Sequence, residues 1–364
     1  MSALLRADLD FKQLERFEVE LYSTFLRQQS HSLFFYDYAY QKLVCTHLNS
    51  ELYVWIAKYA GRVLGAISVA YSQAGPLGVV ANSMPYFGGN GGTITSRELS
   101  VDDDAFIKKR LIEIAFQDAT KKKCASLTMI SNPLDPGSFE ILEEQFGSQP
   151  SDSRIGQFTT LPRSTSEDIE TVLIKQFENP RPRNIRRAIK SGISVKSSNE
   201  RDDLLFLWKT HKSNIEAIGG HVKKQEFFMS VYDQIDHDDW KVFVGRLDKQ
   251  PISALLLFYS RNVVEYFTPA TVSDFRRLQP SALVIYQAML DAVNRGIEYW
   301  NWGGTWETQK GVYDFKKKWG ALDYPYYYFT KIYNDDIFQA TPSELLEYYP
   351  GFYVVNFERL NINE

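Results

Sequence analysis

Two stretches of the chain show the same order of hydrophobic and polar positions. In the first, residues 52–59 and 63–71 are rich in apolar and aromatic side chains and flank a short Ala-Gly-Arg turn, which is typical of an antiparallel hairpin. Residues 105–123 then place apolar side chains on one face of a predicted helix, and residues 125–130 form an apolar run that predicts a buried strand.

The second stretch repeats this order. Its predicted strands span residues 240–245, 252–259, 263–268 and 297–302, and its predicted helix spans residues 280–295. The order hairpin, strand, helix, strand therefore occurs twice, which favours an internal duplication of one α/β unit. The match is one of pattern without residue identity, so two unrelated α/β domains are the alternative.

Two terminal segments carry other patterns. Residues 4–27 alternate charged and apolar side chains at close to helical spacing, whereas Tyr36, Tyr38 and Tyr40 alternate as in an edge strand or a loop. Near the C-terminus, residues 341–344 read Thr-Pro-Ser-Glu, which predicts a helix start with a capping box and proline at its first position.

Composition limits the classes of protein to consider. The chain has 364 residues, of which 44% are hydrophobic and 24% are charged. This length exceeds what one hydrophobic core usually holds, so we expect two domains of roughly 150 to 200 residues. A net charge of −4 gives no overall attraction to nucleic acid or to an anionic membrane, so we expect no DNA partner.

The cysteine content and the N-terminal residues indicate the cellular compartment of the protein. Cys45 and Cys124 lie far apart without metal-type spacing, so neither a disulfide framework nor a metal site is expected. The start carries Arg6, Asp8 and Asp10 and lacks the apolar block of a signal peptide. No window approaches the roughly 18 consecutive apolar residues of a transmembrane helix, so we expect a cytoplasmic protein.

A glycine-rich segment lies between the first hairpin and its helix. Residues 83–92 include Gly88, Gly89, Gly91 and Gly92. Taken alone, such a run indicates a flexible loop. A glycine loop between a strand and a helix can also present backbone N–H groups to an anion or a carbonyl oxygen.

A short basic helix is predicted at residues 184–192, after a Pro-Arg-Pro break at residues 179–183. Four basic residues share one side of this helix, while Ile185 and Ile189 face away. The basic residues are Arg183, Arg186, Arg187 and Lys190. This stripe suits a phosphate or diphosphate because arginine pairs with phosphate through two hydrogen bonds, and a solvated helix face is the alternative.

The most distinctive segment covers residues 299–320, which read YWNWGGTWETQKGVYDFKKKWG. It begins as an aromatic strand, breaks at Gly303 and Gly304 and regains order at residues 311–316. Paired glycines tolerate positive φ and close approach by a ligand, and charged residues among Trp and Tyr side chains indicate a cleft. The alternative is a core strand followed by a helix, with the lysines at residues 316–318 in solvent.

These last three segments resemble motifs of the Fem family of peptidoglycan-bridge aminoacyltransferases, a branch of the GNAT acyltransferase superfamily, and of its relatives in surface-polysaccharide clusters. The resemblance rests on three motifs: the Gly-Gly turn with its Phe-Lys closing motif, the Pro-Tyr-Phe-Gly-Gly loop and the Asn-Ile-Arg-Arg-Ala helix. The resemblance implies an α/β (α+β) fold of two tandem GNAT-like domains, each a mixed, largely antiparallel sheet flanked by helices. We expect domains at residues 1–163 and 164–330, with residues 331–364 packing back on the first.

The resemblance also implies an N-acyltransferase that moves an aminoacyl or acetyl group to an amine of a cell-envelope saccharide or peptidoglycan precursor. The expected partner is a nucleotide-linked or lipid-linked saccharide or muropeptide precursor. Arg183, Arg186 and Arg187 match family positions that contact the diphosphate of such a precursor. Lys316 matches the family's lysine beside the reacting centre, which implies polarisation of the carbonyl. The other predicted substrate-binding residues are Tyr86, Asn90, Tyr266, Trp306, Glu307 and Tyr313. No general base is obvious from the sequence.

The acyl donor is expected to be aminoacyl-tRNA or acyl-CoA, with no permanently bound cofactor. Residues 90–92 are out of register with the glycine pattern of CoA-using GNAT domains, and residues 276–280 lack it, which leaves charged tRNA as a partner. The alternatives are a conventional acetyl-CoA-dependent N-acetyltransferase of amino sugars and a non-catalytic relative that binds a saccharide precursor. His211 and His221 have no carboxylate or cysteine at triad or metal spacing, so both are expected to be structural or solvent-facing.

Overall fold

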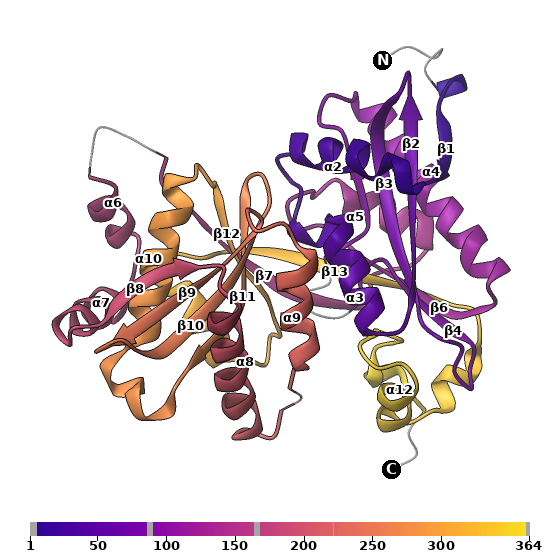
Figure 1. The fold of residues 1–364 in the computed structure, drawn as a ribbon. Coiled ribbons are helices and arrows are strands. Elements are labelled where there is room, and N and C mark those ends of the chain that lie inside the picture. Colours follow the sequence, from indigo (N-terminus) through magenta and orange to yellow (C-terminus); the bar gives the residue numbers. More distant parts are fainter. Residues whose placement is uncertain (1–5, 86–89, 164–167, 221, 362–364) are drawn as a thin grey trace. The chain divides into compact units, whose positions relative to one another are not determined.

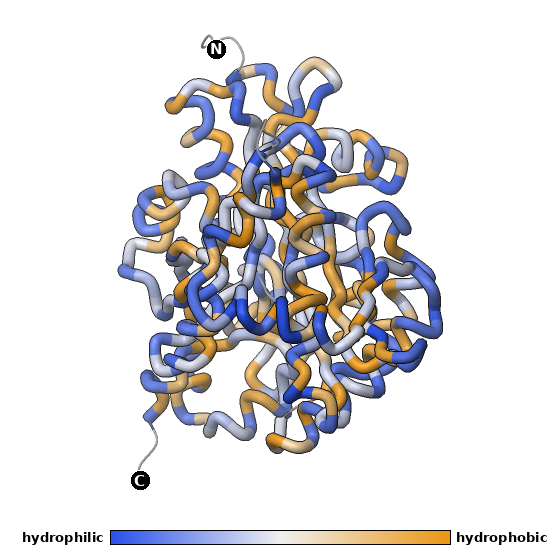
Figure 2. Tube along the Cα trace, turned by 90° about the vertical axis from the view of Figure 1, so that its left-hand side faces the viewer, coloured by the Kyte–Doolittle hydropathy of each residue, from blue (hydrophilic) through white to orange (hydrophobic). Residues whose placement is uncertain are grey.

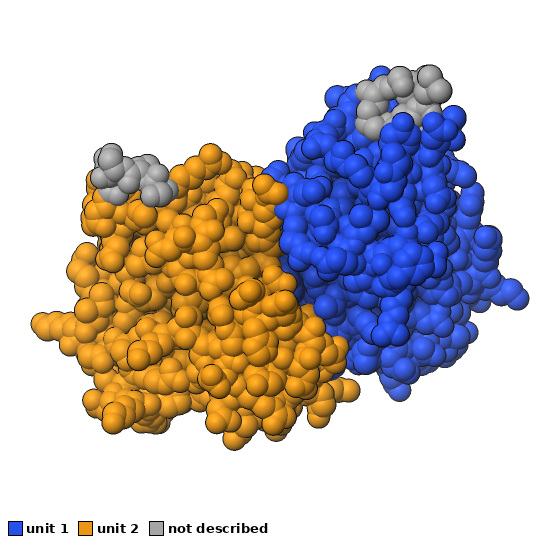
Figure 3. All heavy atoms as spheres, turned by 45° about the horizontal axis from the view of Figure 1, so that its top comes forward, with its two compact units in different colours: residues 1–154, 325–364 blue, residues 155–324 orange. Residues whose placement is uncertain are grey.

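The computed structural model describes residues 6–85, 90–163, 168–220 and 222–361 (Figure 1). The chain divides into two compact units, which Figure 3 colours separately. Unit 1 comprises Met1–Arg154 and Pro325–Glu364, and unit 2 comprises Ile155–Tyr324. Over the described ranges, no helix is both long and apolar enough to cross a membrane.

Unit 1 contains a sheet in the order β1-β2-β3-β4-β6-β13, with β5 paired to β3. The strands are β1 (Asp10–Gln13), β2 (Glu51–Tyr59), β3 (Arg62–Tyr71), β4 (Val79–Asn82), β5 (Thr93–Thr95), β6 (Cys124–Ile130) and β13 (Leu322–Ile332). The α-helices are α2 (Val19–Gln28), α3 (Tyr38–His47), α4 (Val101–Lys121), α5 (Ser138–Phe146) and α12 (Pro342–Tyr348). Short 3-10 turns are η1 (Arg16–Glu18), η2 (Phe34–Tyr36), η4 (Asp335–Gln339) and η5 (Phe357–Arg359).

Unit 2 contains a sheet in the order β7-β12-β11-β10-β9-β8. The strands are β7 (Asp152–Thr160), β8 (Ser194–Ser198), β9 (Trp240–Leu247), β10 (Gln250–Tyr259), β11 (Val263–Thr271) and β12 (Tyr299–Thr305). The helices are α6 (Ile169–Lys175), α7 (Arg181–Lys190), α8 (Arg201–Glu216), α9 (Gln225–Gln234), α10 (Pro280–Asn294) and α11 (Lys310–Lys317), with a 3-10 turn η3 (Ser273–Leu278).

The two units repeat one topology. In unit 1 the antiparallel hairpin β2-β3 leads to β4, helix α4 and β6, and β6 pairs with β4 in parallel. In unit 2 the hairpin β9-β10 leads to β11, helix α10 and β12, and β12 pairs with β11 in parallel. A helix joins each parallel pair because parallel strands need a crossover connection. The predicted order of elements and the predicted fold class are confirmed.

Each unit has its own hydrophobic core. In unit 1, Ile107 and Leu111 of α4 pack on the sheet, and in unit 2, Ala282, Tyr286 and Met289 of α10 do the same. All five side chains are buried, as the helical periodicity of the sequence requires. Figure 2 shows hydrophobic and hydrophilic stretches alternating along the chain.

The predictions for the N-terminal segment were confirmed only in part: residues 19–28 form helix α2, but the residues before and after it differ from the prediction. Where a helix was expected from residue 4, residues 10–13 form strand β1, with Phe11 opposite Ala57 at the edge of the sheet. Tyr38 and Tyr40 lie in helix α3, because the carboxylate of Asp37 accepts a hydrogen bond of 2.8 Å from the Tyr40 backbone N–H and caps the helix.

Two boundaries in unit 2 also differ from the prediction. Helix α7 already begins at Arg181, because Pro182 in its first turn needs no N–H partner within the helix. Strand β12 continues through the glycine pair to Thr305, with an irregularity in its pairing to β7 between Asn301 and Gly304. Gly303 has a φ of 73°, a conformation that favours glycine.

The C-terminal segment packs within unit 1. Helix α12 begins with the predicted capping box, in which the Thr341 side chain accepts from the Glu344 N–H and Glu344 accepts from the Thr341 N–H. Leu345 and Tyr349 are buried in a cluster with Val80 of β4, whereas Leu346 is exposed.

Candidate functional site

Strands β11 and β12 pair over a short distance and then separate. Their parallel register joins Val263 to Tyr299 and Val264 to Trp300, and it ends with Glu265 opposite Asn301. Both strands continue beyond this pair, β11 to Thr271 and β12 to Thr305. Over this described part of unit 2, their backbone groups therefore do not pair with each other beyond Glu265 and Asn301.

A buried carboxylate lies where the two strands diverge. Glu265 is 3% exposed, and its Oε2 accepts a hydrogen bond of 2.6 Å from the Asn301 side-chain amide. The Asn301 side-chain oxygen in turn accepts a hydrogen bond of 2.8 Å from the Gly303 N–H. Burying a carboxylate without hydrogen-bond partners costs free energy. The hydrogen bonds of Asn301 to Glu265 and to Gly303 therefore fix the geometry of β12 at Gly303.

Lys316 holds the next part of β12. Its side chain extends from α11, and its ammonium donates to the carbonyl oxygens of Gly303 and Gly304, each over 3.0 Å. A third hydrogen bond of 2.6 Å goes to Oγ1 of Thr305, whose hydroxyl donates to Gln157 on β7 over 3.1 Å. Lys316 is 5% exposed, so it joins the end of β12 to the helix that follows.

The Lys316 ammonium has little contact with solvent. Burial lowers its pKa from 10.5 to about 8, while three oxygen acceptors favour the protonated form. The group is therefore charged at neutral pH. All three of its N–H groups are engaged, so it can donate to a substrate carbonyl only by exchanging one of these bonds. Its predicted role in carbonyl polarisation stays a prediction.

An arginine that the sequence analysis placed in a break lies beside this region. The Arg181 guanidinium lies 4.3 Å from the centroid of the Phe315 ring and 5.3 Å from that of Trp319. It also donates to the Phe315 carbonyl over 3.1 Å. Burial raises the pKa of the neighbouring Tyr266, and the charge of Arg181 opposes that rise. A signal was present in the sequence: Arg181 immediately precedes a proline, a residue that is frequent in the first turn of a helix.

The three predicted diphosphate-binding residues share the outer side of α7. Arg183, Arg186 and Arg187 are exposed, and the helix is anchored by the buried Ile185 and Ala188. The structure thus brings the three arginines together on one solvent-facing stripe. Of the two isoleucines expected to face inward, Ile189 is instead 54% exposed, because the helix buries only the face that Ile185 shares with Ala188.

Four other predicted residues of unit 2 lie in different segments. Trp306 and Glu307 are exposed and follow the end of β12 directly. The Tyr313 hydroxyl donates to Asp323 over 2.8 Å. Tyr266 packs against Trp302, with ring centroids 4.9 Å apart. Tyr266 therefore belongs to the aromatic group beside Lys316.

In unit 1, the described part of the glycine loop is held in place. Tyr36 donates to the Gly91 carbonyl over 2.8 Å, and a Cβ at Gly91 would lie 2.7 Å from the Ser83 hydroxyl oxygen, so only glycine fits. Asn90 is 2% exposed, and its side-chain nitrogen has no hydrogen-bond partner among the residues that the structure describes. Tyr86 lies outside the described residues.

The two histidines set aside in the sequence analysis differ. His211 on α8 is buried, and burial lowers its pKa to about 4. It is therefore neutral at physiological pH, as expected for a structural histidine. His221 lies outside the described residues.

Comparison with known proteins identifies the fold. Residues 181–317 match the model of the acetyltransferase (GNAT) domain. The solved structure of FemX superposes with a TM-score of 0.71 at 14% identity, covering 90% of this chain and 98% of that one. The chain has the fold of FemX. The family match supports the resemblance to the GNAT superfamily, and the likeness to FemX is one of fold.

Two further solved structures share this fold. A tandem GNAT protein from the clavulanic acid biosynthesis pathway gives a TM-score of 0.51 at 12% identity, covering 89% of this chain and 98% of that one. The C-terminal domain of a putative lysylphosphatidylglycerol synthetase from Agrobacterium fabrum gives 0.53 at 12% identity, covering 85% and 90%. A comparison with curated protein sequences gives no match.

These findings support an acyltransferase. The GNAT match covers α7, the separating strands β11 and β12, and helix α11 with Lys316. A GNAT fold typically takes its acyl group from acyl-CoA as a co-substrate. Glu265 and Asn301, which sequence reasoning missed, lie inside the matched region. Their polar side chains stand in otherwise apolar strand sequences, and this was the signal that could have revealed them.

Proposed function

We propose that the protein transfers an aminoacyl or acetyl group to an amine of a cell-envelope saccharide or peptidoglycan precursor. The observation that carries the proposal is the separation of β11 and β12 at the buried Glu265–Asn301 pair. Separating parallel strands leave backbone N–H and C=O groups that an extended donor can pair with, as a further strand would. The GNAT match and the FemX fold support this class of reaction.

Glu265 is the proposed proton acceptor. In the reaction, the amine nitrogen forms a bond to the acyl carbon, and the bond from that carbon to the donor's sulfur or oxygen breaks. The proton lost by the amine passes to the Glu265 carboxylate, directly or through one water, and then to the leaving thiolate or alkoxide. The hydrogen bond from Asn301 orients the carboxylate for this transfer.

Lys316 has two proposed roles at this site. Its bonds to the Gly303 and Gly304 carbonyls keep the end of β12 away from β11 and preserve the separation. Its positive charge, held with little exposure to water, also stabilises negative charge that develops on a carbonyl oxygen nearby. Stabilising the carbonyl oxygen is the role predicted from the sequence. Holding the end of β12 makes Lys316 a positioning residue as well.

The stripe on α7 is proposed to hold the acceptor. Arg183, Arg186 and Arg187 are exposed and adjacent, which suits the diphosphate of a nucleotide-linked precursor. The partly buried Arg181, packed on Phe315 and Trp319, fixes the start of this helix relative to α11. Asn90, Tyr266, Trp306, Glu307 and Tyr313 remain proposed contacts for the acceptor, as does Tyr86.

The donor is either acyl-CoA or aminoacyl-tRNA, and binding experiments separate the two. Purified protein is titrated with acetyl-CoA, with charged tRNA and with a UDP-linked muropeptide, and the heat of binding is recorded. Saturable binding of the muropeptide together with one donor supports the proposal. Binding of the muropeptide without either donor would replace it with the non-catalytic relative, and binding of acetyl-CoA with free amino sugars alone would replace it with an amino-sugar N-acetyltransferase.

A further inference from the structure

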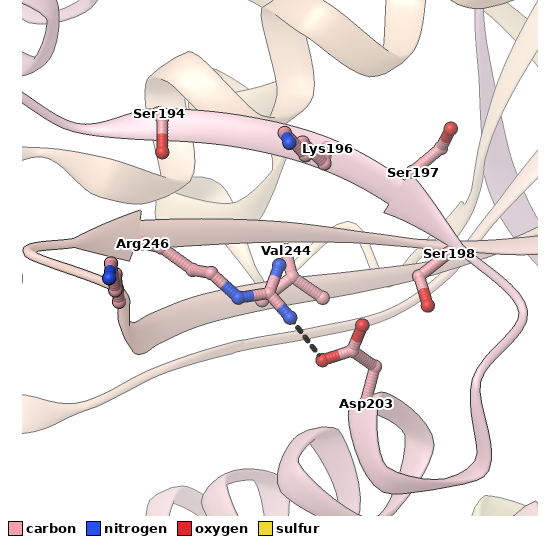
Figure 4. Close-up of a pocket in the computed structure, with 8 residues that line it drawn as sticks. Ser194, Lys196, Ser197, Ser198, Asp203, Val244 and Arg246 are labelled. Carbon is pink, nitrogen blue, oxygen red and sulfur yellow. Dashed lines mark hydrogen bonds and ion pairs between the residues drawn. The ribbon is translucent and has the colours of Figure 1, made fainter.

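A polar hollow lies on the outermost strand of the unit 2 sheet. It has a volume of about 500 Å³ and is lined by residues of β8, β9, the first turn of α8 and the turn after β9 (Figure 4). Strand β8 ends the strand order and pairs with β9. The hollow therefore opens at the edge of the sheet, outside the region around Glu265 and Lys316.

The alternation of side chains along β8 builds one wall of this hollow. Ser194 pairs with Arg246 and Lys196 pairs with Val244, and side chains opposite each other in an antiparallel pair share one face. Val195 points to the other face, where it packs against the core that contains α10. Ser194, Lys196 and Ser198 thus share the face on which Arg246 contacts α8. Ser197 alternates to the face of Val195.

The lining has an excess of positive charge. It includes three cationic side chains, Lys196, Arg246 and Lys249, and a single carboxylate, that of Asp203. Arg246 donates to Asp203 over 2.5 Å, which holds the guanidinium across the floor of the hollow (Figure 4). In the described part of the chain, neither Lys196 nor Lys249 forms an ion pair, so both are available to an anion.

Hydroxyl groups supply the remaining polar contacts. Ser194 and Ser198 line the hollow from this face of β8, and Ser197 borders it with its side chain on the strand's other face (Figure 4). The Ser198 oxygen accepts a hydrogen bond of 2.9 Å from the Glu200 N–H, which leaves its own O–H free to donate. Among the described residues, the lining has no aromatic side chain on which a nucleobase could stack, and this disfavours a nucleotide or a single-stranded nucleic acid.

We propose that this hollow binds a phosphorylated sugar. Lys196 and Lys249 bind the phosphate. Ser194, Ser198 and the Arg246–Asp203 pair bind the sugar hydroxyls. The volume fits one hexose phosphate, since small-molecule sites usually measure about 300 to 1,000 Å³. The site is separate from the arginine stripe of α7, because α7 packs through Ile185 and Ala188 on the core side that Val195 also faces.

The test uses the full chain and three probes: glucose 6-phosphate, glucose and inorganic phosphate. We expect glucose 6-phosphate to bind more tightly than either fragment, measured by calorimetry and by amide shifts in residues 194–198. The double variant Lys196→Gln/Lys249→Gln should weaken binding about tenfold or more, since each charge-assisted hydrogen bond contributes substantially. Lys209→Gln, an exposed lysine on α8 outside the lining, is the matched control and should leave binding unchanged.

A second variant separates this site from the α7 stripe. Arg183→Gln/Arg186→Gln/Arg187→Gln should leave the binding of glucose 6-phosphate unchanged. The proposal is overturned if this triple variant abolishes binding while the double lysine variant does not, or if no probe binds at millimolar concentration. In the latter case Lys196 and the serines would only protect an edge strand from pairing with other chains.

Discussion

The side-chain amide of Asn301 donates a hydrogen bond of 2.6 Å to the carboxylate of Glu265, at the last pair of residues that β11 and β12 share. The same asparagine accepts from the Gly303 N–H, and Lys316 holds the Gly303 carbonyl. One chain of contacts therefore runs from the buried carboxylate to the buried ammonium along the end of β12. The predictions below follow from this chain of contacts and from the charged groups around it.

Replacing Glu265 by glutamine should remove proton transfer and preserve the fold. The glutamine oxygen can still accept from Asn301, so the melting temperature should stay close to that of the parent protein. The rate of acyl transfer should fall by roughly 10² to 10⁴, the usual contribution of a general base. Glu298→Gln is the control, because that carboxylate lies 3.4 Å from the exposed Arg163 and away from the strand separation. Full activity of Glu265→Gln would exclude Glu265 as the base.

Replacing Lys316 by methionine should destabilise unit 2. The carbonyl oxygens of Gly303 and Gly304 and the hydroxyl of Thr305 would lose their donor, at a cost of about 1 to 3 kcal/mol in the free energy of unfolding. Lys317→Met is the matched control, because Lys317 forms a long, partly exposed ion pair of 3.6 Å with Asp323 and a distant contact of 5.8 Å with the Tyr313 ring. Urea unfolding of both variants measures the difference, and equal stability would contradict the positioning role.

Replacing Arg183, Arg186 and Arg187 together by glutamine should weaken acceptor binding without affecting stability. Exposed surface substitutions usually change the free energy of unfolding by less than about 0.5 kcal/mol. The dissociation constant of a UDP-linked precursor should rise about tenfold or more, and its dependence on salt should decrease. Arg181→Gln should instead lower the free energy of unfolding and leave precursor affinity nearly unchanged, because it removes packing on Phe315 and Trp319. Unchanged precursor affinity in the triple variant would remove α7 from the acceptor site.

Protonation of Glu18 should make the free energy of unfolding of unit 1 depend on pH in the acid range. Burial would raise its pKa, but hydrogen bonds from Lys58 and Lys12 lower it from 4.5 to about 2. The pKa is lower in the folded state, so Glu18 stabilises the fold above pH 4.5, and this contribution is lost as the pH falls toward 2. After allowance for solvent screening, the contribution is about 1 to 3 kcal/mol.

The measurement is the free energy of unfolding at several pH values between 5 and 3. Glu18→Gln should be less stable at pH 5 and should lose less stability on acidification than the parent protein. Glu20→Gln is the control, since the Glu20 side chain is 82% exposed and pairs with Arg27. Identical pH profiles for Glu18→Gln and the parent protein would contradict the assignment.

Local patterns were sufficient to predict the elements that the two units have in common. The hairpins, the helices α4 and α10 and the strands around them follow from periodicity, because their apolar faces pack on one sheet. Strand β1 and helix α3 were missed for physical reasons. Strand β1 is stabilised by pairing with a distant strand, and α3 depends on the cap at Asp37.

The candidate site was predictable only in part. The motif around Lys316 pointed to the right segment, but its bonds to Gly303, Gly304 and Thr305 arise from the way α11 folds back on β12. Glu265 and Asn301 lie 36 positions apart in the sequence, and only the parallel pairing of β11 with β12 makes them partners. No local pattern could reveal that contact.

The most direct test of the central claim is acyl transfer by the parent protein and by Glu265→Gln. Labelled acetyl-CoA, or tRNA charged with a labelled amino acid, is incubated with a UDP-linked muropeptide, and label on the muropeptide amine is measured. The parent protein should transfer label from one donor, and the variant should lose at least about a hundredfold in rate with precursor binding unchanged. Precursor binding without transfer from either donor, or equal transfer by both proteins, would contradict the central claim.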